Sequence, residues 1–281
     1  MIPEGNSRAN IDRFLGFQED YDRYRPEAPL LVTKLLTNYL GSPPPLVVDI
    51  GCGTGLSTFL WEEASDSVIG VEPNPDMLSK ALEKLELRNN AKVDSTSSVS
   101  SVSFIQGYAN QLNITSDSVD IVTCSQSFHW MEPVSTLQEI TRILKKGGIF
   151  AAYDCDWPVM LHPDIETRYK QLVAKADEIL NRVLPEEDRA HKWDKEEHLS
   201  RIQASGGFSF SREIVFHHTE TCDAERYIGL TLSQGGVQSV MKLGLADLDQ
   251  DIAEFQSAVG HYFNGRTLQV LISYRMRLGI K

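Results

Sequence analysis

The sequence predicts an α/β fold built around a mostly parallel sheet. Short apolar runs alternate with helix-like stretches through the first half of the chain, and the first run ends in a glycine-rich turn. Strands that alternate with helices form parallel sheets whose right-handed crossovers place helices on both faces. The expected strands are 46–50, 68–71, 102–106, 119–124 and 148–153, and the expected helices are 55–64, 75–88 and 133–144. The last of these helices is expected to stop at Gly147-Gly148.

The second half of the chain is less regular and is expected to add a helical cap. Its expected helices are 163–184, 195–204, 224–243 and 248–263, and its expected strands are 208–218 and 268–276. No internal repeat or linker is visible. We therefore predict that 1–155 holds an N-terminal segment and the cofactor-binding core, and that 156–281 holds a substrate-selecting cap plus the last strands of the same sheet. The Ser-rich stretch 94–103 is expected to be a solvated loop.

Composition excludes several classes of protein. The formal net charge of −12 and the absence of a Lys/Arg-rich block argue against a nucleic-acid partner. No apolar run approaches membrane-spanning length and no secretory signal is visible, so no membrane partner and a cytoplasmic location are expected. The cysteines are scattered and His217-His218 has no spaced partner, so no metal site is expected. The cysteines are Cys52, Cys124, Cys155 and Cys222.

The loop after the first strand carries the functional argument. Residues 47–55 read VVDIGCGTG, which places Gly51, Gly53 and Gly55 beyond the carboxyl end of that strand. Open α/β sheets bind ligands at this position. A dinucleotide fingerprint would need a third glycine at position 56, which is Leu, and the Gly-Lys-Ser/Thr of a phosphate-binding loop is absent. The spacing therefore favours a nucleoside ligand without a pyrophosphate.

Glu72 is the second element of this site. It ends the run VIGVE and follows Gly51 by 21 residues. A carboxylate at the tip of the second strand can accept hydrogen bonds from both hydroxyls of a ribose. Taken alone, Glu72 would more simply be a solvated carboxylate at a strand end. Together with the glycine loop, it predicts a ribose site.

These motifs resemble the class I S-adenosylmethionine-dependent methyltransferases. VVDIGCGTG and GVEPNPDML look closest to the methyltransferase type 11 domain, in the small-molecule branch that includes trans-aconitate methyltransferase relatives. The resemblance continues through FIQGYANQL, SVDIV, SQSFHW and EITRILKKGG, and upstream through YDRYRP. It implies a Rossmann-like doubly wound sheet of seven strands, S-adenosylmethionine as cofactor, and methyl transfer to a small-molecule substrate.

The resemblance also implies which residues bind the cofactor. Tyr108 departs from it, because relatives carry Asp or Ser there to accept the adenine amino group, and Asn110 or backbone near Ala109 would then substitute. Lys146 replaces a common Pro in a turn. The implied cofactor-binding residues are Tyr24, Arg25, Asp49, Gly51, Cys52, Gly53, Gly55, Glu72, Pro73, Met77, Tyr108, Ala109, Asn110, Ser125 and Gln126.

Methyl transfer from a sulfonium chiefly requires that the acceptor's nucleophile is aligned with the methyl–sulfur bond, so no fixed set of catalytic residues is needed. His129 is the candidate general base because it follows the fourth strand, and the alternative is a packed histidine beside Trp130. Tyr21, Tyr24 and Arg25 either form a lid or pack as an amphipathic helix. Trp157 either lines or seals the substrate pocket.

Other functions stay open at this stage. An RNA or protein methyltransferase is disfavoured by the acidic charge, and a nucleotide-dependent oxidoreductase by Leu56. A non-catalytic protein that binds S-adenosylmethionine would keep the same loop. The acceptor atom and the oligomeric state are not encoded in any pattern that we find.

Overall fold

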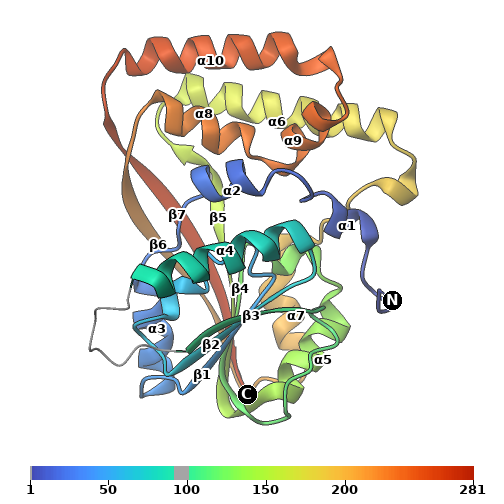
Figure 1. Ribbon diagram of the computed structural model, residues 1–281, viewed down its shortest axis with the longest axis vertical. Helices are drawn as coiled ribbons and strands as arrows, with labels where there is room; N and C mark the ends of the chain where they lie inside the picture. The colour runs from blue at the N-terminus through green and yellow to red at the C-terminus, as the bar shows by residue number, and fades with distance from the viewer. Residues whose placement is uncertain (1, 92–100) are drawn as a thin grey trace.

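A mixed sheet of seven strands runs through the computed structural model, which describes residues 2–91 and 101–281 (Figure 1). The strand order within the described residues is β3-β2-β1-β4-β5-β7-β6. Strands β1 to β5 pair in parallel, whereas β7 is antiparallel to both β5 and β6. The strands are β1 Leu46–Ile50, β2 Ser67–Glu72, β3 Ser101–Gln106, β4 Val119–Ser125, β5 Leu144–Met160, β6 Phe210–Cys222 and β7 Leu268–Ile280. The predicted doubly wound, mostly parallel seven-stranded sheet is confirmed.

The central strands place the ligand crevice. β1 and β4 are buried on both faces, as their nearly unbroken apolar sequences predict. The chain leaves β1 toward β2 and β3 and then returns to β4 on the other side of β1. This reversal opens a crevice beyond the carboxyl ends of β1 and β4. The glycine loop lies at this point.

Helices cover both faces of the sheet. On one face, α3 (Leu31–Leu40) packs Val32 and Leu36 against Val47 and Ile121 of the strands. The helix α4 (Pro75–Ala91) lies on this face near the β3 edge, where Ala81 meets Phe104. On the other face, α5 (Pro133–Ile143) and α7 (His198–Ala204) cover Val48, Val122 and Phe150.

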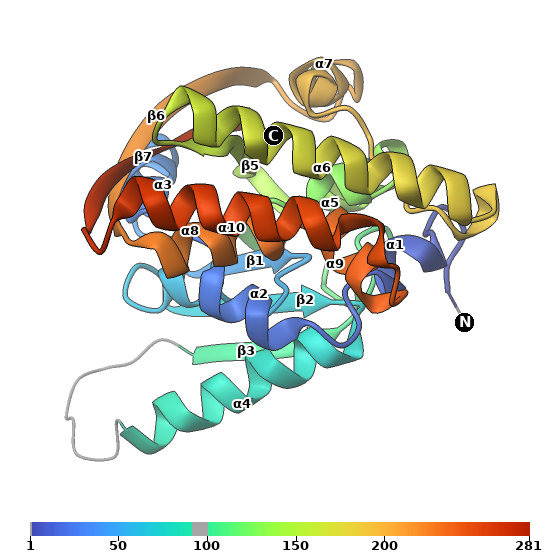
Figure 2. The same cartoon turned by 90° about the horizontal axis from the view of Figure 1, so that it is seen from above.

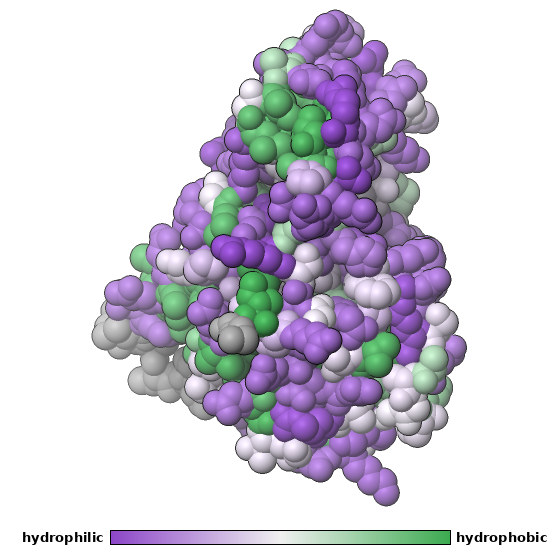
Figure 3. All heavy atoms as spheres, turned by 90° about the vertical axis from the view of Figure 1, so that its right-hand side faces the viewer, coloured by the Kyte–Doolittle hydropathy of each residue, from purple (hydrophilic) through white to green (hydrophobic). Residues whose placement is uncertain are grey.

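A helical cap lies above the carboxyl ends of the strands (Figures 1 and 2). It consists of α6 (Pro163–Val183), α8 (Ala224–Leu232), α9 (Gly235–Lys242) and α10 (Asp249–Phe263). The long helix α6 buries a stripe at helical spacing, made of Ile165, Tyr169, Leu172, Ala176 and Ile179, and packs against α9 and α10. Figure 3 shows a largely hydrophilic face whose apolar residues gather near its upper end, over the cap.

The N-terminal segment lies between the cap and the sheet (Figure 1). It contains two short helices, α1 (Arg8–Asp12) and α2 (Gln18–Tyr24), and α2 contacts both α4 and α8. No helix in the described part of the chain has both the length and the apolar character needed to cross a membrane.

Several element predictions were wrong in detail. The expected helix 55–64 is a series of turns with one 3-10 turn at Phe59–Trp61. The expected helix 224–243 is broken into α8 and α9, since Gly235-Gly236 weakens a continuous helix and Arg25 binds the Ser233 carbonyl at the break. The helix α5 ends at Ile143 because the following residues already pair in β5. Residues 94–100 of the Ser-rich stretch lie outside the described residues, and 101–103 belong to β3.

Candidate functional site: a glycine-lined pocket and its adjoining chamber

The turn after β1 requires glycine at two positions for different reasons. Gly51 has a φ of 67°, and a Cβ there would lie 2.6 Å from the Cβ of Ser127. Gly53 has a φ of 57°, but a Cβ there would meet only Tyr21, at 3.8 Å. Gly51 therefore permits close packing of the loop on the turn after β4, whereas Gly53 leaves open space above the loop.

Asp49 holds this loop from below. Its Oδ2 accepts a hydrogen bond from the Thr58 hydroxyl at 2.7 Å, and its Oδ1 accepts one from Thr123 at 2.8 Å. Burial raises the pKa of Asp49 to about 6, against the opposing effect of these two hydrogen bonds. The side chain is fully buried and does not line the pocket described below. Asp49 therefore fixes the loop, and the structure does not bring it to the pocket wall with the other predicted cofactor residues.

Glu72 is held at the pocket wall by two backbone amides. The amide of Gly53 donates to Oε2 at 2.8 Å, and the amide of Asn74 donates to Oε1 at 2.9 Å. Burial raises the pKa of Glu72 to about 7, although both backbone hydrogen bonds act to lower it. Each carboxylate oxygen has a second lone pair, so both can still accept a hydrogen bond from a ligand. Glu72 is thus a fixed, double acceptor.

The loop and Glu72 border a pocket of about 740 Å³, including its open mouth. The structure brings together eight of the predicted cofactor residues at this pocket, namely Gly51, Gly53, Glu72, Pro73, Met77, Ala109, Ser125 and Gln126. Gly51, Gly53 and Glu72, predicted from the loop and the strand end, thus line the same pocket as five residues that the family resemblance implied.

The opposite wall comes from the N-terminal segment. Only Tyr21 of this wall was singled out from the sequence, and the other members are Asn6, Ser7, Asn10, Ile11 and Phe14. Asn10 is buried and ties the segment in place, because its amide donates to the carbonyls of Trp130 and His191 at 2.8 Å each. The Asn74 amide likewise donates to the Ile11 carbonyl at 2.8 Å. No spacing signal marks these residues, since they become a wall only through long-range contacts.

Three predicted residues near the loop and β3 point elsewhere. The Cys52 thiol lies against the β2–β3 side of the core, where burial raises the pKa of the thiol well above its usual value. A Cβ at Gly55 would lie 2.8 Å from the Phe104 ring, so this glycine serves packing. Tyr108 bridges to Gln111 in the turn after β3, and its neighbours Gly107 and Ala109 line the pocket instead.

Three further predicted residues hold the N-terminal segment. The Asn110 amide donates to the Glu4 carbonyl at 2.8 Å and its Oδ1 accepts from Asn6 at 2.8 Å. The Tyr24 ring packs against Gly229 of α8. Arg25 donates to the Ser233 carbonyl at 2.9 Å and lines the second cavity rather than the first. These three residues do not line the pocket; they hold the N-terminal segment against the core and the cap.

The second cavity, here called the cap chamber, lies between the core and the cap. It is open to solvent over a space of about 2060 Å³ and is walled by α6, by α9 and by the segment 184–195. Phe14, Tyr21, Gln126 and Trp130 line both the pocket and the chamber. Trp157 lines the chamber, in agreement with one of its two predicted roles. The two cavities therefore meet at a shared aromatic junction.

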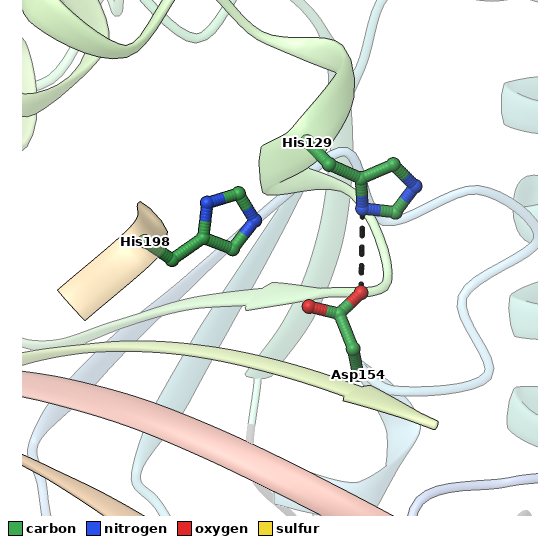
Figure 4. Close-up of side chains that lie close together, drawn as sticks. All are labelled: His129, Asp154 and His198. Atoms are coloured by element: carbon green, nitrogen blue, oxygen red, sulfur yellow. Dashed lines mark ion pairs between the residues drawn. The ribbon is translucent and has the colours of Figure 1, made fainter. Parts of the chain in front are cut away.

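His129 reaches the chamber from the turn after β4 and pairs with Asp154 of β5 (Figure 4). Its Nδ1 lies 3.3 Å from Asp154 Oδ1, and both side chains are buried. Burial lowers the pKa of His129 to about 3, and Lys195 adds to this effect. Burial alone would raise the pKa of Asp154, but Lys195 and His129 together hold it well below its usual value. The pair is thus a neutral imidazole beside a carboxylate.

His198 completes a group of three possible metal ligands in Figure 4. The donor atoms of His129, Asp154 and His198 lie within 4.8 Å of one another. However, the Lys195 ammonium lies 2.7 Å from Asp154 Oδ1, where it already supplies the positive charge that a metal would bring. Nearby Arg277, Arg201 and Lys195 also lower the pKa of His198, after burial itself. The local charge therefore favours an ion pair over a metal.

Comparisons with known proteins agree with this geometry. Residues 48–152 match the family model described as a methyltransferase domain. A probable S-adenosylmethionine-dependent methyltransferase of Saccharomyces cerevisiae is 35% identical over 133 residues, which cover 47% of this chain and 43% of that protein. The match thus spans less than half the length of this curated relative.

Solved structures support the fold. A candidate type II methyltransferase from Anaeromyxobacter dehalogenans has a TM-score of 0.61 at 18% identity, covering 92% of this chain and 98% of that chain. A Haemonchus contortus phosphoethanolamine N-methyltransferase, solved with phosphomonomethylethanolamine and S-adenosylhomocysteine, has a TM-score of 0.55 at 14% identity, covering 98% of this chain and 60% of that chain. At these identities the likeness concerns the fold alone.

Proposed function

We propose that this chain, whose residues 48–152 match a methyltransferase domain, is a class I S-adenosylmethionine-dependent methyltransferase that transfers the cofactor's methyl group to a small-molecule acceptor. The observation that carries the proposal is the junction of two cavities. A pocket bordered by a glycine loop and a fixed double acceptor adjoins a chamber beneath the cap, and four residues line both. Cofactor and acceptor would meet at that junction.

The residues of the pocket fit the cofactor. Glu72 would accept hydrogen bonds from the two ribose hydroxyls, and the open space above Gly53 would admit the chain that leaves the sugar. Gly107 and Ala109 would border the adenine, whereas Gln126 lines both the pocket and the chamber. When bound, S-adenosylmethionine supplies an electrophilic methyl group on a sulfonium, which becomes a thioether after transfer.

The chain itself aligns the two reactants and excludes water. The N-terminal segment closes one side of the pocket through Asn10, and Phe14 and Trp130 supply apolar surface at the junction. Holding reactants in line and shielded supplies much of the rate enhancement that such a transfer needs. The position of the chamber, beneath the cap and beside the cofactor pocket, supports a small acceptor.

His129 is poorly suited to remove a proton. With a pKa of about 3 its imidazole is neutral at pH 7 and holds an extra proton weakly. We therefore assign His129, with Asp154, to shaping the chamber wall rather than to general-base catalysis. An acceptor atom that is nucleophilic at neutral pH, without losing a proton first, fits this site best.

Transfer of a radioactive methyl group tests the proposed function. The full chain is incubated with S-adenosyl-[methyl-³H]methionine and, in separate reactions, with a metabolite extract, total RNA and denatured protein. We expect label in the small-molecule fraction alone. Label in RNA or protein would contradict the small-molecule acceptor. Binding of S-adenosylhomocysteine without transfer to any fraction would indicate a non-catalytic binding protein.

The pKa of Glu72 predicts that cofactor binding depends on pH. Because burial raises this pKa to about 7, Glu72 loses its charge as the pH falls through that value. Only the ionised carboxylate accepts hydrogen bonds with both oxygens, so affinity for S-adenosylhomocysteine should fall by up to about tenfold per pH unit below 7 and level off above it. Calorimetric titrations from pH 5.5 to 8.5 check this. The slope between pH 6 and 7 should vanish in Glu72→Gln, and a slope that persists there would assign it to another group.

A further inference from the structure

We propose that Arg13 and Lys192 form an anion subsite in the cap chamber, which holds a carboxylate or phosphate group of the acceptor. This inference rests on the proposed function, since it names the substrate class of the same site. The two cations lie on the same aromatic ring: the Arg13 Cζ is 3.9 Å and the Lys192 Nζ is 5.9 Å from the centroid of Trp130. Because Trp130 lines both cavities, an anion held here would lie next to the cofactor pocket.

Arg13 is charged and lacks a partner. It follows α1 on the N-terminal segment, and its guanidinium packs against Gly235 of α9. Its buried Nε has no hydrogen-bond partner, and no ion pair to Arg13 is found among the described residues. Burial lowers the pKa of Arg13 to about 10, so the group remains protonated at neutral pH. A ligand that accepts a hydrogen bond from this Nε would satisfy the donor that the protein leaves unpaired.

Lys192 approaches the same Trp130 ring from a segment that lies far from Arg13 in the sequence. It lies on the segment after α6, lines the chamber and is exposed to solvent, with no hydrogen bond or ion pair in the described part of the chain. Burial lowers the pKa of Lys192, and the like charges of Lys195 and Arg13 lower it further. Arg13 and Lys192 carry like charges near one ring, and an anion that contacts both would relieve their repulsion.

The other charged groups of the chamber do not cancel this site. Lys195 is paired with Asp154, and Arg25 is bonded to the Ser233 carbonyl. Asp12 is paired with Arg8 at 3.1 Å. Asp177 of α6 partly offsets the charges of Arg13 and Lys192, but no contact between them is close enough for an ion pair. Glu187 and Asp188 also line the chamber, on the exposed segment after α6. With six Arg/Lys and four Asp/Glu side chains, the chamber is cationic in a chain of net charge −12.

The pair of donors defines the ligand chemistry. A guanidinium binds two oxygens of one planar or tetrahedral anion, and an ammonium adds a point charge. A carboxylate and a phosphate monoester share this chemistry. A carboxylate would also be a nucleophile that needs no base, in agreement with the neutral His129.

Titration of small anions tests the subsite. The full chain, saturated with S-adenosylhomocysteine, is titrated calorimetrically with succinate and with inorganic phosphate, and with succinamide as the uncharged control. We expect one of the two anions to bind. Succinamide should show no measurable binding and should not compete with that anion. The tighter anion identifies the carboxylate or the phosphate as the source. Arg13→Gln and Lys192→Met should each weaken that anion by about tenfold or more, as expected for a hydrogen bond to a charged group.

Matched variants keep this test decisive. Lys170→Met removes an exposed lysine of α6 outside the chamber and should leave anion affinity unchanged. If Arg13→Gln fails to fold, Arg13→Lys should fold and bind the anion with intermediate affinity. Absence of anion binding to wild type, with or without S-adenosylhomocysteine, would overturn the subsite. So would a loss of S-adenosylhomocysteine affinity, rather than anion affinity, in Lys192→Met. If S-adenosylhomocysteine itself does not bind, the proposed function fails separately.

Discussion

Replacing Glu72 with Gln should weaken S-adenosylhomocysteine binding by about 100-fold, because two hydrogen bonds to a charged acceptor are lost or weakened. The carboxylate is held by the amides of Gly53 and Asn74, so its position in the pocket is fixed before the ligand arrives. A Gln side chain keeps the shape, but its amino group must face either one of these backbone donors or a ribose hydroxyl. Calorimetry at about pH 8, where Glu72 is ionised, measures the effect.

The control for this variant is Glu83→Gln on α4. Glu83 is exposed and pairs with Lys80 at 3.2 Å, so its loss removes the same charge without touching the pocket. Wild-type affinity in Glu83→Gln and wild-type melting in both variants would assign the effect to the site. An unchanged dissociation constant in Glu72→Gln would show that Glu72 does not hold the sugar.

Replacing Gly53 with Ala should lower cofactor affinity by about tenfold or more with a smaller loss of stability. The new methyl group would meet no protein atom closer than 3.8 Å, so it would occupy the space intended for the ligand. Crowding a ligand by one methyl group costs about 1–3 kcal/mol, similar to overpacking a core. The positive φ of 57° adds a folding cost of about 1–2 kcal/mol. Binding is measured by calorimetry and folding by thermal melting.

Gly41→Ala separates these two costs. Gly41 has a φ of 86° at the end of α3, and a Cβ there would meet nothing within 4 Å. This variant should therefore show the folding cost alone and bind the cofactor normally. Equal affinity losses in the two variants would mean that backbone strain, and not occupied ligand space, explains the result at Gly53.

The pocket wall that contains the glycine loop and Glu72 could be predicted from the sequence, because local signals define it. Gly51, Gly53 and Glu72 lie at the ends of adjacent buried strands, and the order of a parallel sheet brings strand ends together. Asp49, by contrast, does not line the pocket. A carboxylate one strand residue away from the loop points into the core, where Thr58 and Thr123 satisfy it.

The opposite wall, which the N-terminal segment forms, and the contacts across the chamber could not be predicted in the same way. Asn10 contacts Trp130 and His191, which follow it by 120 and 181 residues, and no local pattern encodes such contacts. The ion pair of Asp154 with Lys195 likewise joins β5 to a segment after α6. Hydrophobic periodicity locates helices such as α6, but it does not say which polar side chains meet across the chamber.

A crystal structure of the full chain with S-adenosylhomocysteine tests the central claim most directly. We predict that the nucleoside lies over Gly53, with both ribose hydroxyls within hydrogen-bond distance of the Glu72 carboxylate and the sulfur facing Trp130. A nucleoside bound elsewhere, or a ribose without contact to Glu72, would contradict the account.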